Sequence, residues 1–170
     1  THTINLQHQL LEKDIPTLQK ALDGYLPFKV AVLKGRTNYV CKRKIEEFKE
    51  YSEFKTKENA IIFDEKVTKW ERQTDNGEKQ DADENTLQLW SKIHSDRNDC
   101  KGKKCKYSSS CYVNQARKRQ FNADIVILNH ATFFTDLLLK EFKGAKGFLK
   151  DFDVVVFDEG HHIQHIVTDT

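Results

Sequence analysis

The sequence predicts an α/β protein in which the two ends of the chain build a parallel sheet and the middle forms a mainly helical insertion. Asp124–Leu128, Ala131–Phe142 and Phe152–Phe157 follow one another as an apolar strand, an apolar helix and a second apolar strand. Strands of nearly continuous Val, Ile and Leu are typical of parallel sheets that are covered on both faces. Phe28–Leu33 is a further short strand, whereas residues 34–120 are charged and lack such strands.

The N-terminal part of the chain, residues 1–33, is predicted to hold two helices followed by that strand. Ile4–Leu11 places its apolar residues at helical spacing, and Thr3 could cap this helix. Ile15-Pro16 begins a second helical segment, because the first turn of a helix does not need the N–H that proline lacks. We expect residues 1–33 and 121–170 to belong to one domain.

The middle of the chain, residues 34–120, is predicted to be a separate unit of helices and loops. Asn38–Tyr51, Thr86–Ile93 and Asn114–Phe121 have helical patterns, and Asp75-Asn76-Gly77 is a turn signal. All four cysteines of the chain lie in this segment. The sequence therefore predicts an insertion that carries its own ligand site.

The composition argues against a membrane protein and favours a partner with phosphate groups. No apolar run approaches the roughly 20 residues that span a bilayer, and the polar start without Met leads us to expect an excised piece of a longer protein. Glu50–Asp99 carries 13 acidic and 8 basic residues, a net charge of −5, whereas Cys100–Ala123 carries 7 basic residues and no acidic one, a net charge of +7. Cationic segments suit phosphate backbones, and a solvated charged surface is the alternative for any single lysine.

The four cysteines are the first candidate site. Cys41, Cys100, Cys105 and Cys111 are separated by 58, 4 and 5 residues. Four thiolates can hold an iron–sulfur cluster or a structural zinc ion, and two disulfides are a third interpretation. Four unrelated thiols without a common ligand are the remaining alternative. The absence of a Cys-x-x-Cys pair favours iron–sulfur over zinc without deciding between them.

The end of the chain is the second candidate site. Val154–Phe157 is followed by Asp158 and Glu159, at the carboxyl end of a predicted strand, where α/β sheets bind ligands. One carboxylate can hold Mg²⁺ and the next can orient an attacking water. A metal pair formed by His161 and His165 and a capped strand end without chemistry are the alternatives. The chain has no G-x-x-x-x-G-K-[ST] phosphate-binding loop.

Four ordered segments resemble the XPD/DinG-type superfamily 2 DNA helicases, and DinG in particular. Thr1–Leu10 resembles motif Ia, and Lys34–Cys41 resembles the region of the first cluster ligand. Ala123–Ala131 resembles the strand and turn that re-enter the motor domain. Asp158–His161, Asp-Glu-Gly-His, resembles motif II in the glycine variant of DinG. The acidic stretch between residues 50 and 99 carries no such signature.

The resemblance implies part of a RecA-like motor domain with an inserted iron–sulfur domain, in an ATP-dependent helicase that unwinds DNA from 5′ to 3′. It implies that Asp158 serves Mg²⁺, that Glu159 serves the attacking water, and that His161 couples the nucleotide site to neighbouring motifs. ATP, Mg²⁺ and a [4Fe-4S] cluster are the implied cofactors. The implied cluster ligands are Cys41, Cys100, Cys105 and Cys111.

DNA contacts are expected from the motif Ia segment and from the basic residues near the cysteines, with Tyr107 and Tyr112 stacking on bases. The expected partners are single-stranded and forked DNA, ATP and a single-stranded-DNA-binding protein, for a monomer in the cytoplasm at the bacterial nucleoid. A zinc-bound nucleic-acid-binding module and a redox sensor are the competing functions. The residues expected at DNA are Thr1, Thr3, Asn5, Arg36, Lys101, Lys103, Lys104, Lys106, Arg117, Lys118 and Arg119.

Overall fold

A computed structural model describes residues 4–22, 25–50, 63–143 and 146–163. The chain divides into two compact units, one made of Thr1–Gly35 with Ala116–Thr170 and the other of Arg36–Gln115. The assignment of residues 34–120 to an iron–sulfur insertion, between domain parts 1–33 and 121–170, stays a prediction.

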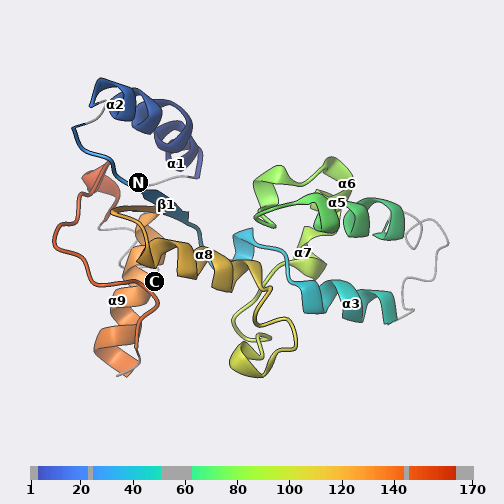
Figure 1. The fold of residues 1–170 in the computed structure, drawn as a ribbon. Coiled ribbons are helices and arrows are strands. Elements are labelled where there is room, and N and C mark those ends of the chain that lie inside the picture. The colour runs from blue at the N-terminus through green and yellow to red at the C-terminus, as the bar shows by residue number, and fades with distance from the viewer. Residues whose placement is uncertain (1–3, 23–24, 51–62, 144–145, 164–170) are drawn as a thin grey trace. The chain divides into compact units, whose positions relative to one another are not determined.

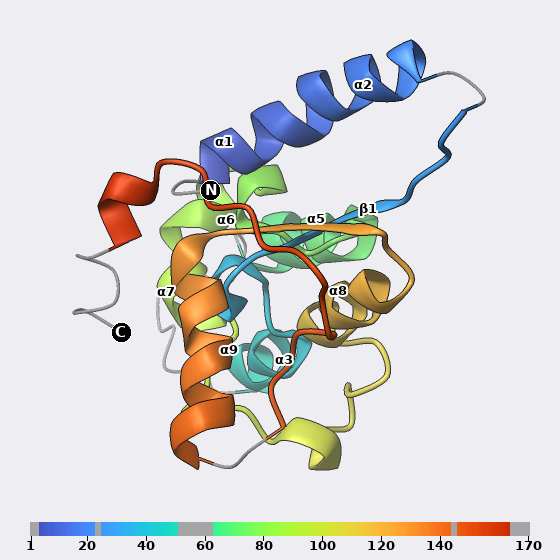
Figure 2. The same cartoon turned by 90° about the vertical axis from the view of Figure 1, so that its left-hand side faces the viewer.

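The first unit begins with a helical rod that the sequence predicted as two separate helices. Helix α1, Ile4–Gln9, continues through a π-helical turn, Leu10–Asp14, into helix α2, Ile15–Ala21, and Figure 2 shows them as one rod. Pro16 lies in the first turn of α2, as expected, but the rod is continuous there, so the N–H that proline lacks is missing from within the rod rather than from a free helix end. The predicted Thr3 cap falls outside the described residues.

A two-stranded parallel sheet follows, so the predicted α/β class is confirmed in this coarser form. Strand β1, Val30–Leu33, pairs in parallel with strand β2, Ile125–Leu128, in the register Val30 opposite Ile125. Asp124 fixes the start of this pairing, because its carboxylate accepts the Lys29 N–H at 2.7 Å and its own N–H donates to the Lys29 carbonyl at 2.8 Å.

Two helices complete the description of this unit. Helix α8, Tyr112–Phe121, begins in the second unit, belongs to this one from Ala116 on and leads into β2, and helix α9, His130–Lys143, leaves β2. The Gln120 side chain donates to the Phe148 carbonyl at 2.6 Å. The buried Asp136 carboxylate accepts the Phe148 and Leu149 N–H groups. The loop after α9 is thereby held by side chains from both helices.

The prediction of a buried strand at Phe152–Phe157 is wrong. This segment is irregular, and Val154 and Val156 are 76% and 83% exposed. Phe157 packs instead against Phe133 and Phe134 of α9, with ring centroids 5.3 and 6.0 Å apart. An apolar run becomes a strand only where a neighbouring strand receives its N–H and C=O groups, and no described strand lies beside this one.

The second unit contains short helices packed around a small core. Helix α7, Trp90–Ile93, contacts both helix α3, Lys42–Glu50, and helix α6, Glu84–Gln88 (Figure 1). Helix α5, Thr68–Gln73, follows a π-helical turn, Phe63–Val67. The predicted helix 86–93 is therefore two helices, and the predicted helix 38–51 starts later, at Lys42. Single turns of 3₁₀ helix occur in this unit at Arg36–Asn38, Lys79–Asp81 and Gly102–Lys104, and in the first unit at Gly160–His162.

The core of this unit is aromatic and aliphatic. Tyr39, Val40 and Ile93 are almost fully buried. The predicted turn at Asp75-Asn76-Gly77 is present, and Gly77 has φ +62°, a left-handed conformation that favours glycine. None of the helices in the described part of the chain has the length and apolar character needed to cross a bilayer.

Candidate cysteine site and carboxylate tail

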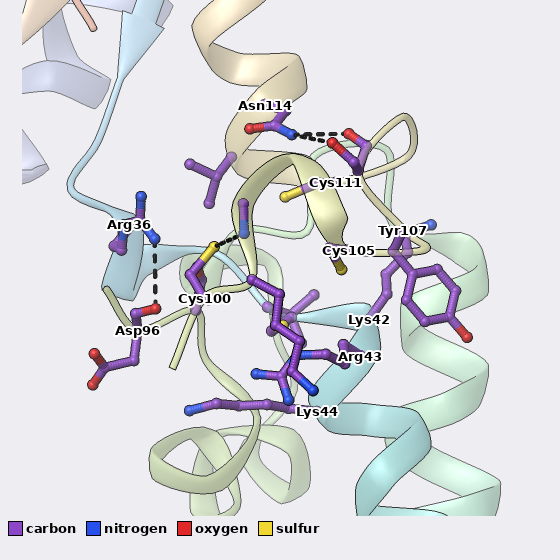
Figure 3. A pocket seen from close by; sticks show the side chains of 17 residues that line it. Arg36, Lys42, Arg43, Lys44, Asp96, Cys100, Cys105, Tyr107, Cys111 and Asn114 are labelled. Atoms are coloured by element: carbon purple, nitrogen blue, oxygen red, sulfur yellow. Dashed lines mark hydrogen bonds between the residues drawn. The ribbon is translucent and has the colours of Figure 1, made fainter. Parts of the chain in front are cut away.

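The four cysteines line one cavity of about 40 Å³ in the second unit. Cys41 precedes α3, while Cys100, Cys105 and Cys111 come from the loop before α8. Figure 3 shows the latter three thiols on that loop, with Arg43 and Lys44 reaching in from α3. All four are free thiols, so the structure does not contain the two disulfides of the third interpretation. The fold thus brings to one cavity cysteines that have 58 residues between them in sequence.

Cys41 is fixed at the N-terminus of α3. Its N–H donates to the Ile93 carbonyl at 2.8 Å, and its carbonyl accepts the Ile45 N–H at 3.0 Å. Burial raises the pKa of the Cys41 thiol, and this outweighs the lowering by the N–H groups of Lys44 and Arg43. Binding of a metal or cluster would have to displace this proton.

Cys100 has the opposite electrostatic balance. Burial alone would raise its pKa, but the Gly102 N–H, which lies 3.4 Å from the sulfur, and the guanidinium groups of Arg36 and Arg43 lower it overall. The lowered pKa favours the thiolate, which is the form that binds a metal. Cys100 is also exposed, so this side of the cavity is open to an incoming ligand.

The four thiols are a donor set that an iron–sulfur cluster or a single zinc ion could use. Four thiols around one cavity match a Cys₄ cluster, in which each iron can take one thiolate. A tetrahedral zinc site needs all four sulfurs about 2.3 Å from one point. In the described residues no group of three or more His, Cys, Asp and Glu side chains is close enough to hold one metal ion.

The basic residues near the cysteines are not equally available to DNA. Lys101, Lys103 and Lys104 are exposed and make no ion pair with a described residue. Lys106 instead pairs with Glu46 and lies over the Tyr107 ring, 5.3 Å from its centroid. The cavity-lining Arg36 donates to the Asp96 carbonyl at 3.4 Å.

The expectation that Tyr112 stacks on bases is wrong, because its ring belongs to the core. Tyr112 is 5% exposed, and Lys42 lies over the ring at 4.6 Å. Its hydroxyl lies 3.0 Å from both the carbonyl and the carboxylate of Glu71. Burial, with Glu71 adding to it, raises the pKa of the Tyr112 hydroxyl. Tyr107 is half-buried and stays a candidate.

The remaining predicted DNA contacts lie in the first unit. Asn5 is exposed on α1, whereas Thr1 and Thr3 fall outside the described residues. Arg117 packs over Phe148, 4.5 Å from the ring centroid. Lys118 and Arg119 are exposed in the last turn of α8.

The carboxylate tail is also part of the first unit. Asp158 and Glu159 are exposed and follow irregular chain rather than a strand. Glu159 has φ +54°, and its Oε2 lies 3.3 Å from Nδ1 of His161. Oxygen ligands of this type suit Mg²⁺, which takes its other ligands from water and substrate phosphates. His165, the other member of the alternative metal pair, is not described.

The sequence did not single out the residues that hold the cysteine loop. Asn114 donates to the Ser108 carbonyl at 2.8 Å, between Cys105 and Cys111. Arg43 and Asp99 form an ion pair beside Cys100. No pattern distinguishes these residues from their charged and polar neighbours, because their partners lie far away or in irregular loops.

Comparison with known proteins identifies the family. The sequence profile of a family described as DEAD_2 matches residues 7–170, nearly the whole chain. The chain belongs to the DEAD_2 family. Together with the relatives described next, which include YoaA and DinG helicases, this match confirms the resemblance to DinG-type helicases.

The relatives of this DEAD_2 chain carry helicase and nuclease names. It is 34% identical over 171 residues to the ATP-dependent DNA helicase YoaA of Haemophilus influenzae, covering 99% of the chain and 26% of that protein. It is 30% identical over 184 residues to the ATP-dependent helicase DinG of Mycobacterium tuberculosis, covering 99% and 27%. It is 26% identical over 175 residues to the 3′-5′ exonuclease DinG of Bacillus subtilis, covering 99% and 17%. The chain therefore spans about a quarter of the length of the first two relatives.

Proposed function

We propose that this chain is part of an ATP-dependent DNA helicase of DinG type, which unwinds DNA from 5′ to 3′ by hydrolysing ATP. The match of residues 7–170 to the DEAD_2 family carries the proposal. The names of YoaA and DinG relatives support ATP and DNA as substrates. The full-length protein is proposed to act as a monomer at the nucleoid in the cytoplasm, on single-stranded and forked DNA, with a single-stranded-DNA-binding protein as partner.

The four cysteines are proposed to hold a [4Fe-4S] cluster in the Arg36–Gln115 unit. Their common cavity and the lowered pKa of the Cys100 thiol support this assignment. The cluster would supply four iron–thiolate bonds that cross-link a loop-rich unit. That unit would be the iron–sulfur domain inserted into a RecA-like motor domain.

The tail residues are proposed to serve ATP hydrolysis. Asp158 would hold Mg²⁺ and Glu159 would orient the attacking water. His161, which already contacts Glu159 at 3.3 Å, would couple this site to neighbouring motifs. ATP and Mg²⁺ would bind together with residues from other parts of the longer protein.

Metal analysis of the full-length protein tests the cluster. Anaerobic purification is expected to give brown protein with about four irons per chain and matching sulfide, following the Cys₄ rule. Iron and sulfide assays with a visible absorbance spectrum measure this. Colourless protein with stoichiometric zinc would overturn the assignment and favour the zinc-bound nucleic-acid-binding module.

Salt titration of single-stranded DNA binding tests the basic loop. Changing Lys101, Lys103 and Lys104 together to Gln is expected to weaken binding. It should reduce the slope of log affinity against log salt by about 2, since each lost contact on a single strand contributes roughly 0.7. The matched control changes Lys69, Lys79 and Lys92 to Gln, which are exposed in the same unit. Equal slopes for the two triple variants would refute a role for the basic loop.

A further inference from the structure

Helix α3 is linked by charged contacts to the loop that carries Cys100. Asp99 immediately precedes Cys100 in sequence. Nη2 of Arg43 lies 2.8 Å from the Asp99 carbonyl oxygen and 3.1 Å from Oδ1 of its carboxylate. Nζ of Lys44 lies 3.3 Å from the other oxygen, Oδ2. Two residues in the first turn of α3, which follows Cys41, therefore bind Asp99, the residue before Cys100.

The other two cysteines are tied to the same helix through their sequence neighbours. Lys106, which follows Cys105, pairs with Glu46 of α3. Tyr112, which follows Cys111, shares the Glu71 carboxylate with Lys42 of α3, at 3.0 and 3.1 Å. Each of the three loop cysteines thus has a neighbour that contacts α3 directly or through one carboxylate.

Arg43 is the most buried of the basic side chains in these links. The Arg43 side chain is 9% exposed, whereas the Lys106 side chain is 62% exposed and its ion pair is screened by water. Nη1 of Arg43 also lies 2.5 Å from the Glu47 carboxylate, one turn along α3. A guanidinium group is planar and always charged, so bonds on two sides fix its orientation.

We propose that Arg43 is a positioning residue for the cluster: it holds Asp99, and through Asp99 it keeps Cys100 beside Cys41 before the cluster binds. This inference rests on the proposed [4Fe-4S] site. Replacing a residue that orients a metal ligand typically weakens metal binding by about 10- to 100-fold. A ligand that is held in place beforehand loses less conformational freedom when the metal binds. Cys41 and Cys100 need such a link most, because 58 residues of chain lie between them.

The test compares cluster retention in full-length variants. Arg43→Gln is expected to lose iron to a chelator about 10-fold faster than the parental protein, in line with ligand-orienting residues of other sites. Arg43→Lys should retain iron better than Arg43→Gln, because lysine keeps the positive charge although it lacks the planar guanidinium group. The matched control is Arg97→Gln, which removes the same charge from an exposed position three residues before Cys100. Iron content and the visible spectrum are followed over time, without any assay of unwinding.

A double-mutant cycle with Asp99→Asn separates positioning from general stability. Asp99 is 49% exposed, so this variant is expected to fold even if Arg43→Gln does not. The double variant should lose iron more slowly than the product of the two single effects predicts, because both changes weaken the Arg43–Asp99 link: Asp99→Asn removes its carboxylate part and Arg43→Gln removes the whole of it. If the increases in the rate of iron loss multiply in the double variant, the inference about Arg43 is wrong. It is also wrong if Asp99→Asn and Arg43→Gln lose iron only as fast as Arg97→Gln. In either case the proposed cluster still stands. A parental protein without iron would overturn the proposed cluster and the inference with it.

Discussion

Glu159→Gln in the full-length protein is expected to reduce ATP turnover by about 100-fold or more, while nucleotide and DNA binding stay near the parental values. The amide keeps the size of the side chain and loses the charge that would orient and deprotonate water. Transfer of a phosphoryl group to water requires that the water is held in position and that a metal ion neutralises the negative charge of the phosphate. The exposed position of Glu159 means that this substitution removes no buried packing. Steady-state ATPase rates under saturating DNA measure the effect.

Two further variants make that experiment specific. Asp158→Asn should raise the Mg²⁺ concentration needed for half-maximal turnover, because a neutral oxygen ligand binds the ion more weakly. Glu141→Gln is the matched control, since it removes one carboxylate from an exposed position on α9 in the same unit. Parental turnover in Glu159→Gln would mean that the carboxylate tail is a surface feature without a catalytic role.

The sheet shows how far local pattern determines this fold. Asp124–Leu128 and Phe28–Leu33 were predicted as strands, and β2 and β1 lie within them, paired in parallel. Phe152–Phe157 has the same apolar composition but is not a strand, because pairing depends on neighbours that no local pattern encodes. Composition therefore identified segments able to form strands, and tertiary contacts decided which of them did.

The sequence predicts which cysteines form the candidate site, but it does not predict which residues hold them in place. The spacing of the cysteines marked them as a ligand set, and all four line one cavity. The role of Tyr112 was misjudged, because its basic surroundings in sequence did not reveal its contact with Glu71, 41 residues away. Arg43 was indistinguishable from Lys42 and Lys44 until the structure placed its guanidinium against Asp99.

Cys105→Ser is expected to abolish binding of the proposed cluster and to loosen the Arg36–Gln115 unit far more than the rest of the protein. The loop that carries this cysteine has little structure of its own: Lys101–Lys104 are exposed, and short turns such as Ser108 N–H to the Cys105 carbonyl, at 2.9 Å, hold it. In such a segment the free energy of metal or cluster binding becomes free energy of folding. Losing about 3 kcal/mol of it would raise the opened fraction roughly 100-fold.

Limited proteolysis of the full-length protein measures this opening, because cleavage follows the opened population when opening and closing are fast. Thermolysin cuts within residues 36–115 should accelerate in Cys105→Ser, with cuts in residues 116–163 changing little. Ser109→Ala is the matched control, an equally small change at an exposed position of the same loop. Unchanged protection of residues 36–115 in iron-free Cys105→Ser would show that the unit folds without its cluster. The cysteines would then serve electron transfer or sensing rather than stability.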